Sequence, residues 1–198
     1  MARPKKDPLQ ADTRSRILEA AGEEFGRRGF EGARLEDIAA RIGIRRASLF
    51  HYFESKEALY QEAVQATFSF LRRRLWKVFR ARDTAAQAVE RLVTEYLAFA
   101  EEYPASQQLF MRELVNPGGE GYAMLSREVL PLLSGVERFL KARGGPRLRD
   151  PASLRQAVLT WSLSAAARAA MGPHAKELWG RSNHDLALAR AMVFSEAG

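Results

Sequence analysis

Apolar residues recur every three or four positions along most of the chain, which is the spacing of amphipathic helices. The first stripe predicts a helix over residues 12–28 that ends at Gly29. A second stripe predicts a short helix over residues 35–42. Gly43 follows it, where a residue without Cβ can adopt a left-handed backbone conformation. A third short helix is expected over residues 45–53.

The remainder of the chain predicts longer helices and contains no alternating strand pattern. Ser55 is a good N-cap for a helix that runs to about Arg80 or Arg82. Further helices are expected over residues 84–103, 109–115, 121–143, 150–171 and 183–196. Pro131 lies inside one of them and predicts a kink or a break there. The predicted fold is therefore all-α.

The pattern divides the chain into three parts. Residues 1–11 carry prolines and cations, and we interpret them either as a flexible basic arm that reaches a minor groove or as a disordered tail. Residues 12–56 form the predicted helix-turn-helix domain, and residues 57–198 form a larger helical domain.

The helix after the turn has two chemically different sides. Leu49 and Phe53 are four residues apart and can both face a core. The remaining side chains combine cations, a hydroxyl, aromatic rings and an imidazole: Arg45, Arg46, Ser48, Phe50, His51 and Tyr52. Such side chains suit phosphates and the edges of bases, so this helix is the predicted DNA reader.

An ordinary αα-hairpin with a solvated basic face would share the turn glycine and the apolar stripe. The flanks add a longer pattern from Gly29 to Leu59, in which a glycine is followed by LEDIAARIGI, SLFHYF and ESKEAL. Over these residues the chain resembles the DNA-binding domain of the TetR family of transcriptional regulators. The resemblance implies a ligand-responsive regulator, most often a repressor.

The resemblance also implies roles for single residues. Phosphate contacts fall at Tyr52 and Lys56, and base-edge or groove contacts fall at Arg45, Arg46, Ser48, Phe50 and His51. The chain departs from the family pattern at Phe50, where tyrosine is usual. It departs again at Arg34, where a Ser or Thr cap is usual and where an arginine can instead reach a phosphate.

Charge and composition change this picture little. The chain has 31 Lys and Arg against 24 Asp and Glu, a net charge of +7, which suits a polyanionic partner. The excess is spread along the chain, so it supports nucleic-acid binding only weakly. There is no cysteine, no apolar run as long as a membrane span and no signal-peptide pattern, so a cytoplasmic protein without a membrane partner is expected.

No catalytic or metal-binding pattern is present in the sequence. The chain has three histidines and lacks a phosphate-binding glycine loop, a nucleophile elbow and metal-ligand spacing. We therefore expect no enzymatic activity, no metal and no cofactor. The alternative to a specific regulator is a sequence-indifferent DNA-coating or architectural protein.

The resemblance further implies a small-molecule pocket in the larger domain. Candidate lining residues, each of which is also a candidate for ordinary core packing, are Phe68, Trp76, Phe79, Tyr96, Phe99, Phe110, Met111, Tyr122 and Trp161. Arg168 is a candidate partner for a carboxylate or phosphate, although a surface salt bridge is the plainer interpretation. The expected effector is a lipophilic acid or an acyl-CoA.

The last two predicted helices are rich in small side chains, which allow close helix packing. They pack within one chain or, as the resemblance implies, against a second copy. The expected interface residues are Leu154, Val158, Ala165, Ala169, Leu186, Ala189 and Val193. A twofold homodimer would place two readers ~34–36 Å apart on a palindromic operator.

Overall fold

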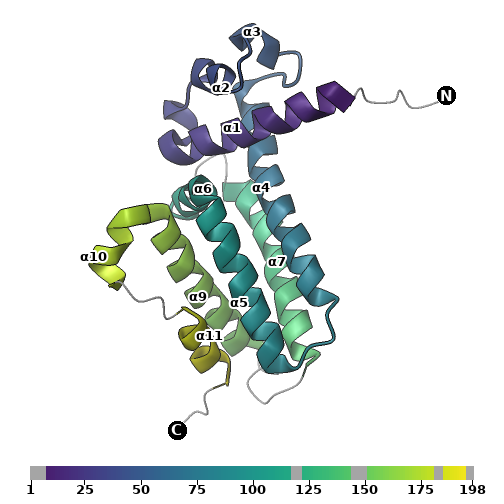
Figure 1. Ribbon diagram of the computed structural model, residues 1–198, viewed down its shortest axis with the longest axis vertical. Coiled ribbons are helices and arrows are strands. Elements are labelled where there is room, and N and C mark those ends of the chain that lie inside the picture. The colour runs from purple at the N-terminus through teal and green to yellow at the C-terminus, as the bar shows by residue number, and fades with distance from the viewer. Residues whose placement is uncertain (1–7, 117–121, 144–150, 181–184, 195–198) are drawn as a thin grey trace, which may run out of the picture.

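The computed structural model describes residues 8–116, 122–143, 151–180 and 185–194 (Figure 1). This part of the chain is helical and contains no β-strand, which confirms the all-α prediction. The helices are α1 (Pro8–Gly32), α2 (Leu35–Arg41), α3 (Arg46–Leu49), α4 (Lys56–Phe79), α5 (Ala85–Glu102), α6 (Pro104–Leu114), α7 (Tyr122–Lys141), α9 (Pro151–Met171), η1 (Gly172–His174), α10 (Ala175–Trp179) and α11 (Asp185–Phe194).

The first helix is longer at its N-terminus than the sequence predicted. It begins at Pro8, so residues 8–11 of the expected arm are helical, while residues 1–7 lie outside the described part. Proline is favoured in the first turn of a helix because it needs no N–H partner there. At the other end Gly29 has φ 74°, and the ring of Phe30 stacks on that of Phe25 at 6.2 Å, as predicted.

A first hydrophobic core joins α1, α2, α3 and the first turns of α4. Its largest fully buried side chains include Ile17, Phe25, Ile38 and Tyr60. The core extends along α4 to Phe68 and reaches α6. The predicted domain boundary at residue 56 therefore coincides with the start of a continuous helix whose upper turns belong to this N-terminal core.

Two proline-containing segments differ from the expectations. The helix expected over 109–115 begins five residues earlier, because Pro104 occupies its first turn, where it is tolerated. The helix α7 continues through Pro131 without a break. Pro131 is exposed, so the carbonyl group that loses its helical hydrogen bond there can be hydrated.

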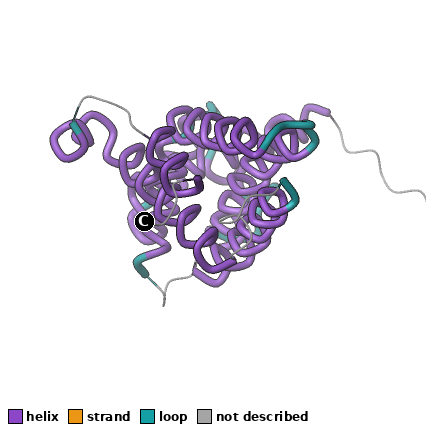
Figure 2. Tube along the Cα trace, turned by 90° about the horizontal axis from the view of Figure 1, so that it is seen from below, coloured by secondary structure: helices purple, strands orange, loops and turns teal. Residues whose placement is uncertain are grey.

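A second core joins the lower part of α4 with α5, α7, α9 and α11. Seen from below, the helices of the molecule lie side by side around a common centre (Figure 2). Since α4 contributes to both cores, it runs from the helix-turn-helix to the opposite end of the molecule (Figure 1).

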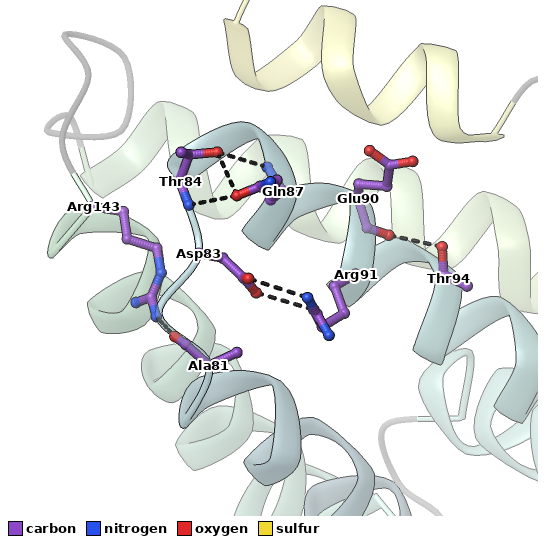
Figure 3. A network of polar contacts seen from close by, with 8 residues as sticks. All are labelled: Ala81, Asp83, Thr84, Gln87, Glu90, Arg91, Thr94 and Arg143. Carbon is purple, nitrogen blue, oxygen red and sulfur yellow. Dashed lines mark hydrogen bonds and ion pairs between the residues drawn. The ribbon is translucent and has the colours of Figure 1, made fainter.

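Polar contacts close that opposite end (Figure 3). Arg143, after α7, donates to the backbone oxygen of Ala81 at 2.7 Å, and Arg91 pairs with Asp83 at 3.0 Å. Thr84 and Gln87 form a capping box that begins α5. These contacts fix the lower end of α4 relative to α5 and α7.

Candidate nucleic-acid interface and internal cavity

The turn between α2 and α3 is built as the sequence predicted. Gly43 has φ 75°, and the N–H of Ile44 donates to Ala39 O at 3.0 Å. Ile44 is half-buried and packs against the first core, which anchors the turn. Two features therefore set the helix-turn-helix geometry: the left-handed backbone conformation of Gly43 and the apolar side chain of Ile44 packed against the core.

The reader segment is shorter as an α-helix than expected. The α-helix α3 covers Arg46–Leu49, and the chain continues to residue 53 mainly in tight turns. Their hydrogen bonds include His51 N to Ser48 O at 3.3 Å and Tyr52 N to Leu49 O at 2.9 Å. The tightening places both Leu49 and Phe53 in the core, as predicted.

The predicted contact residues lie on the outer side of this segment. Arg45, Arg46 and His51 are exposed, and Phe50 is 47% exposed, so its ring does not pack inward. Ser48 and Tyr52 are half-buried, and the ring of Tyr52 packs against the first core. Four of these six side chains are therefore freely accessible.

The two neighbouring arginines of the reader are held differently. Arg46 pairs with Glu36 at 3.3 Å, and its guanidinium lies over the Phe50 ring at 5.7 Å. Arg45 and Arg34 are both exposed, and neither side chain has a hydrogen bond, ion pair or ring contact with another described residue. The positive charge of Arg45 is thus not neutralised within the described part of the chain.

Lys56 begins α4 but is partly committed to its own domain. Its Nζ donates to Glu31 O at 3.2 Å and lies 4.9 Å from the centre of the Phe30 ring. Ser55 caps the helix by accepting from Ala58 N at 3.1 Å. The pKa of the neighbouring Glu57 is lowered, because its carboxylate accepts hydrogen bonds from the backbone N–H of Glu57 and from the Ser55 side chain.

Several arginines that sequence reasoning missed brace the helix-turn-helix. Arg16 of α1 donates to Ile42 O at 3.1 Å, Arg41 pairs with Glu23, and Arg28 lies 3.7 Å from Asp37. These partners are far apart in sequence and follow no helical spacing. No pattern in the sequence distinguishes these braces from solvated charges.

The C-terminal bundle contains a partly open cavity of about 110 Å³ between α4, α5, α6, α7 and α9, with Ala189 of α11 also in its wall. Five of the predicted lining residues contribute to it: Phe68, Tyr96, Phe99, Phe110 and Trp161. Most of the remaining lining is aliphatic and comes from leucine and valine side chains. Leucines and valines at core spacing give no sequence signal that separates a cavity wall from a packed core.

The other predicted lining residues do not contact this cavity. Trp76, Phe79, Met111, Tyr122 and Arg168 are outside its wall. Trp76 is 53% exposed and Tyr122 is also exposed, because both project from outer helix faces. Arg168 pairs instead with the buried Asp185, so the salt-bridge interpretation of this arginine is confirmed.

A few polar atoms are set into the cavity wall. The Tyr96 hydroxyl lies 3.1 Å from Ser162 O and 3.4 Å from Gln107 Oε1. Burial raises the pKa of Tyr96, so it remains a neutral phenol. Trp161 is 7% exposed, and its Nε1 has no hydrogen-bond acceptor among the described residues.

Three of the residues predicted to form a dimer interface, Leu154, Ala165 and Ala189, are buried within the chain's own second core, so that prediction is wrong for them. Val158 and Leu186 pack partly against the same core, and Ala169 is half-buried. The side chain of Val193 lies outside the described part. Small side chains at helical spacing indicated close packing correctly, but the partner helices belong to the same chain.

None of the described helices combines the length and the apolar character that crossing a bilayer requires.

Comparisons with known proteins agree with this geometry. The family model described as "Bacterial regulatory proteins, tetR family" matches residues 17–63, which span the helix-turn-helix and the start of α4. The HTH-type transcriptional regulator RutR of Escherichia coli K12 is 34% identical over 99 residues, which are 50% of this chain and 46% of RutR. The negative regulator IcaR of the icaADBC biofilm operon of Staphylococcus aureus is 27% identical over 89 residues, which are 45% of this chain and 48% of IcaR. The match thus spans about half the length of these curated relatives.

The fold comparison extends over nearly the whole chain. A TetR-like transcriptional regulator from Rhodococcus sp. RHA1 has a TM-score of 0.68 at 17% identity, covering 97% of this chain and 96% of that one. At this identity the likeness shows the fold alone. The sequence match thus assigns residues 17–63 to the DNA-binding domain of bacterial regulatory proteins of the tetR family, and the chain as a whole shares the fold of a TetR-like regulator.

Proposed function

We propose that the protein is a transcriptional repressor that binds a palindromic operator as a homodimer and is released by a small lipophilic effector. The observation that carries the proposal is the outward face of the reader segment, where the Arg45 side chain is exposed beside Phe50 and His51 and has no partner among the described residues. An arginine in the major groove can contact guanine O6 and N7 together. IcaR, which matches the N-terminal half, is named a negative regulator, and repression is proposed here on that basis.

The surface around the reader supports a groove-binding role. Exposed Arg34 begins α2 beside the reader, where it can contact a phosphate. Lys56 is held against Glu31 O, so it contributes positive charge near the phosphates from a fixed position. The Phe50 ring offers an apolar edge to a thymine methyl group.

A single reader of this size makes too few contacts for a specific site, so a second copy is required. The outer faces of α9 and α11 are the proposed pairing surface. Their exposed positions include the small or apolar side chains of Thr160, Ala187, Leu188 and Ala191, with Leu188 40% exposed, beside the polar Arg155, Gln156 and Arg190. Such a surface allows two helix pairs to approach closely.

Helix α6 connects the cavity to the DNA-binding end. Gln107 and Phe110 line the cavity, while Glu113 on the same helix accepts a buried hydrogen bond from Tyr60 of α4. Helix α6 also approaches α1 closely at Gly26, where an added Cβ would lie only 2.0 Å from Ala105 O. A displacement of α6 is thus transmitted to both α1 and α4.

The proposed switch follows from this connection. An effector that fills the cavity shifts the dimer toward the conformation in which its affinity is higher. Release requires that this conformation separate the two readers from the operator spacing. Because polar contacts fix the lower end of α4 near Arg143 and Asp83, the displacement is expected at its upper end, next to the reader (Figure 3).

Selection of preferred duplexes from random DNA by the purified protein tests the DNA-binding part. We expect enrichment of an inverted repeat whose half-site centres lie about one helical turn apart. Equal affinity for all duplexes at fixed salt would contradict the proposal and favour the sequence-indifferent coating protein.

A further inference from the structure

We infer that the molecule recognised by the cavity between α4, α5, α6, α7 and α9 is uncharged, compact and mostly apolar, and that it accepts a hydrogen bond from Trp161. This inference rests on the effector role proposed above and names the chemical class of the effector. It replaces the lipophilic acid or acyl-CoA expected from the sequence.

The wall of the cavity carries no formal charge. Its described lining contains no Asp, Glu, Lys, Arg or His, and its polar members are Thr67, Ser106, Ser162, Gln107 and Tyr96, with the indole of Trp161. A carboxylate in such surroundings would lose its hydration without gaining a cation, which is strongly unfavourable. Arg168, the cation once expected to meet it, is paired with Asp185 outside this wall.

Trp161 supplies a buried donor in the cavity wall that has no acceptor in the described part of the chain. Its ring is buried against Tyr96 in an edge-on contact at 5.1 Å, and Nε1 has no acceptor among the described residues. Buried indole N–H groups usually have a partner. Since Trp161 lines the cavity, a carbonyl, ether or hydroxyl oxygen on a bound molecule is the natural acceptor.

The neighbouring polar atoms are already engaged with one another. The Tyr96 hydroxyl has the backbone oxygen of Ser162 as an acceptor at 3.1 Å, with Gln107 Oε1 also within reach. Tyr96 therefore serves to position the indole and can itself accept, but not readily donate, a further hydrogen bond. Trp161 Nε1 is therefore the position at which we expect a bound molecule to place an acceptor.

The size of the cavity limits the molecule. At about 110 Å³ it is smaller than the ~150 Å³ engineered cavity that holds benzene. A single ring or a short chain is therefore the scale that fits with modest adjustment of the wall. A long acyl chain exceeds this volume.

Three ring compounds of similar size separate the possibilities: cyclohexanone, its hydrocarbon counterpart methylenecyclohexane, and cyclopentanecarboxylate. Binding to the full-length protein is measured by calorimetry at neutral pH without DNA. We expect both neutral compounds to bind and the carboxylate to bind about a hundredfold more weakly than cyclohexanone, because the wall offers it no cation. Tighter binding of the carboxylate, or of decanoate, would overturn the inference.

The variant Trp161→Phe isolates the hydrogen bond. It should weaken cyclohexanone about tenfold more than methylenecyclohexane, since the change in shape affects both compounds but the lost donor affects only the ketone. Trp76→Phe is the matched control, because Trp76 is exposed and lies outside the wall. An equal change for both compounds in Trp161→Phe would overturn the role of Trp161, and the ratio remains meaningful even if the variant is less stable.

These measurements need no operator, so they separate the ligand class from the proposed function. Absence of binding by both neutral compounds, with sequence-specific DNA binding intact, contradicts the ligand class alone. If cyclohexanone binds but leaves operator affinity unchanged at saturation, the ligand class is supported and the effector role is contradicted.

Discussion

Arg45 and Arg46 are adjacent in sequence but differ in the contacts that their side chains make within the protein. Arg46 is paired with Glu36 and lies over Phe50, whereas Arg45 has no partner in the described part of the chain. We expect Arg45→Ala to cost ~1–3 kcal/mol of operator affinity and to relax the preference at one base pair, because a bidentate base contact is lost. Arg46→Ala should cost less, since DNA binding must first break an existing ion pair.

Measurement of duplex affinity on the selected operator and on single-base variants checks this prediction. Arg80→Ala is the control, because Arg80 is an exposed arginine at the far end of α4. A uniform loss across all base variants for Arg45→Ala would show that Arg45 contacts only the phosphate backbone.

Gly26 and Gly22 lie one helical turn apart on α1 and differ in the space beside them. A Cβ at Gly26 would lie 2.0 Å from the backbone oxygen of Ala105, whereas at Gly22 the nearest atom is Thr67 Oγ1 at 3.9 Å. Gly26→Ala should destabilise the protein by ~1–3 kcal/mol or more, because α1 and α6 must separate. Gly22→Ala should stabilise it by ~0.5–1 kcal/mol through helix propensity. Urea denaturation of both variants measures the difference, and equal stabilities would contradict the close approach.

For single residues, the sequence predicted which side chains face the core and which face solvent. It did not predict the residues that these side chains contact on other helices. The helical spacing of Leu49 and Phe53 correctly placed both in the core and left Arg45, Phe50 and His51 outside. The pairing of Arg46 with Glu36 and the contact of Gly26 with Ala105 join separate elements. Such pairs depend on how helices cross, which periodicity along one helix does not encode.

The start of α5 depends on a local cap that can be tested by itself. Thr84 Oγ1 accepts from Gln87 N at 3.3 Å, and Gln87 Oε1 accepts from Thr84 N at 3.1 Å (Figure 3). Thr84→Ala should lower the free energy of unfolding by about 1 kcal/mol, because the backbone N–H of Gln87 loses its acceptor and the capping box is broken. Thr94→Ala, also exposed on α5, removes only a hydroxyl bonded back to Glu90 O and should change stability by less than about 0.5 kcal/mol. Thermal denaturation distinguishes the two, and a similar loss in both variants would contradict the capping role.

Helix α6 is joined to α4 by a hydrogen bond in the core. The Tyr60 hydroxyl donates to Glu113 Oε1, and both side chains are buried. Tyr60→Phe should destabilise the protein by ~1–3 kcal/mol, because the buried carboxyl group loses a donor. Tyr122→Phe, at an exposed site on α7, is the matched control and should have little effect. Unchanged stability in Tyr60→Phe, measured by urea denaturation, would show that this contact does not join the two helices.

Helix order and type were predictable for the long helices, while two helix starts at proline were not. The spacing of apolar residues identified α4, α5 and α9 correctly, with Ser55 as the cap of α4. Pro8 was placed in the flexible arm and Pro104 was expected to end the preceding helix, but each begins a helix. Proline is compatible with a first turn and unfavourable in an interior, so its effect depends on which residue starts the helix.

Over the whole molecule, the same kinds of side chain favour packing within one chain and packing between two chains. The pattern of Leu154, Ala165 and Ala189 indicated a closely packed helix interface. These residues do form such an interface, but it lies inside one protomer. The cavity raises the same difficulty, because Phe99 and Trp161 line it while Phe79 packs in the adjoining core. Apolar periodicity identifies buried faces, and only the assembled bundle determines what lies opposite them.

The outer face of α11 is where the proposed homodimer can be tested against the DNA-binding function. Leu188 is 40% exposed there, on the helix next to α9. Leu188→Glu should convert the dimer to a monomer in analytical ultracentrifugation, because a charge within an apolar pairing surface is unfavourable. Affinity for the palindromic operator should fall about a hundredfold or more, since two half-sites no longer bind as one unit. Leu130→Glu is the matched control, because Leu130 is 53% exposed but lies on α7. A Leu188→Glu protein that remains dimeric with full operator affinity would place the twofold axis on another face of the bundle.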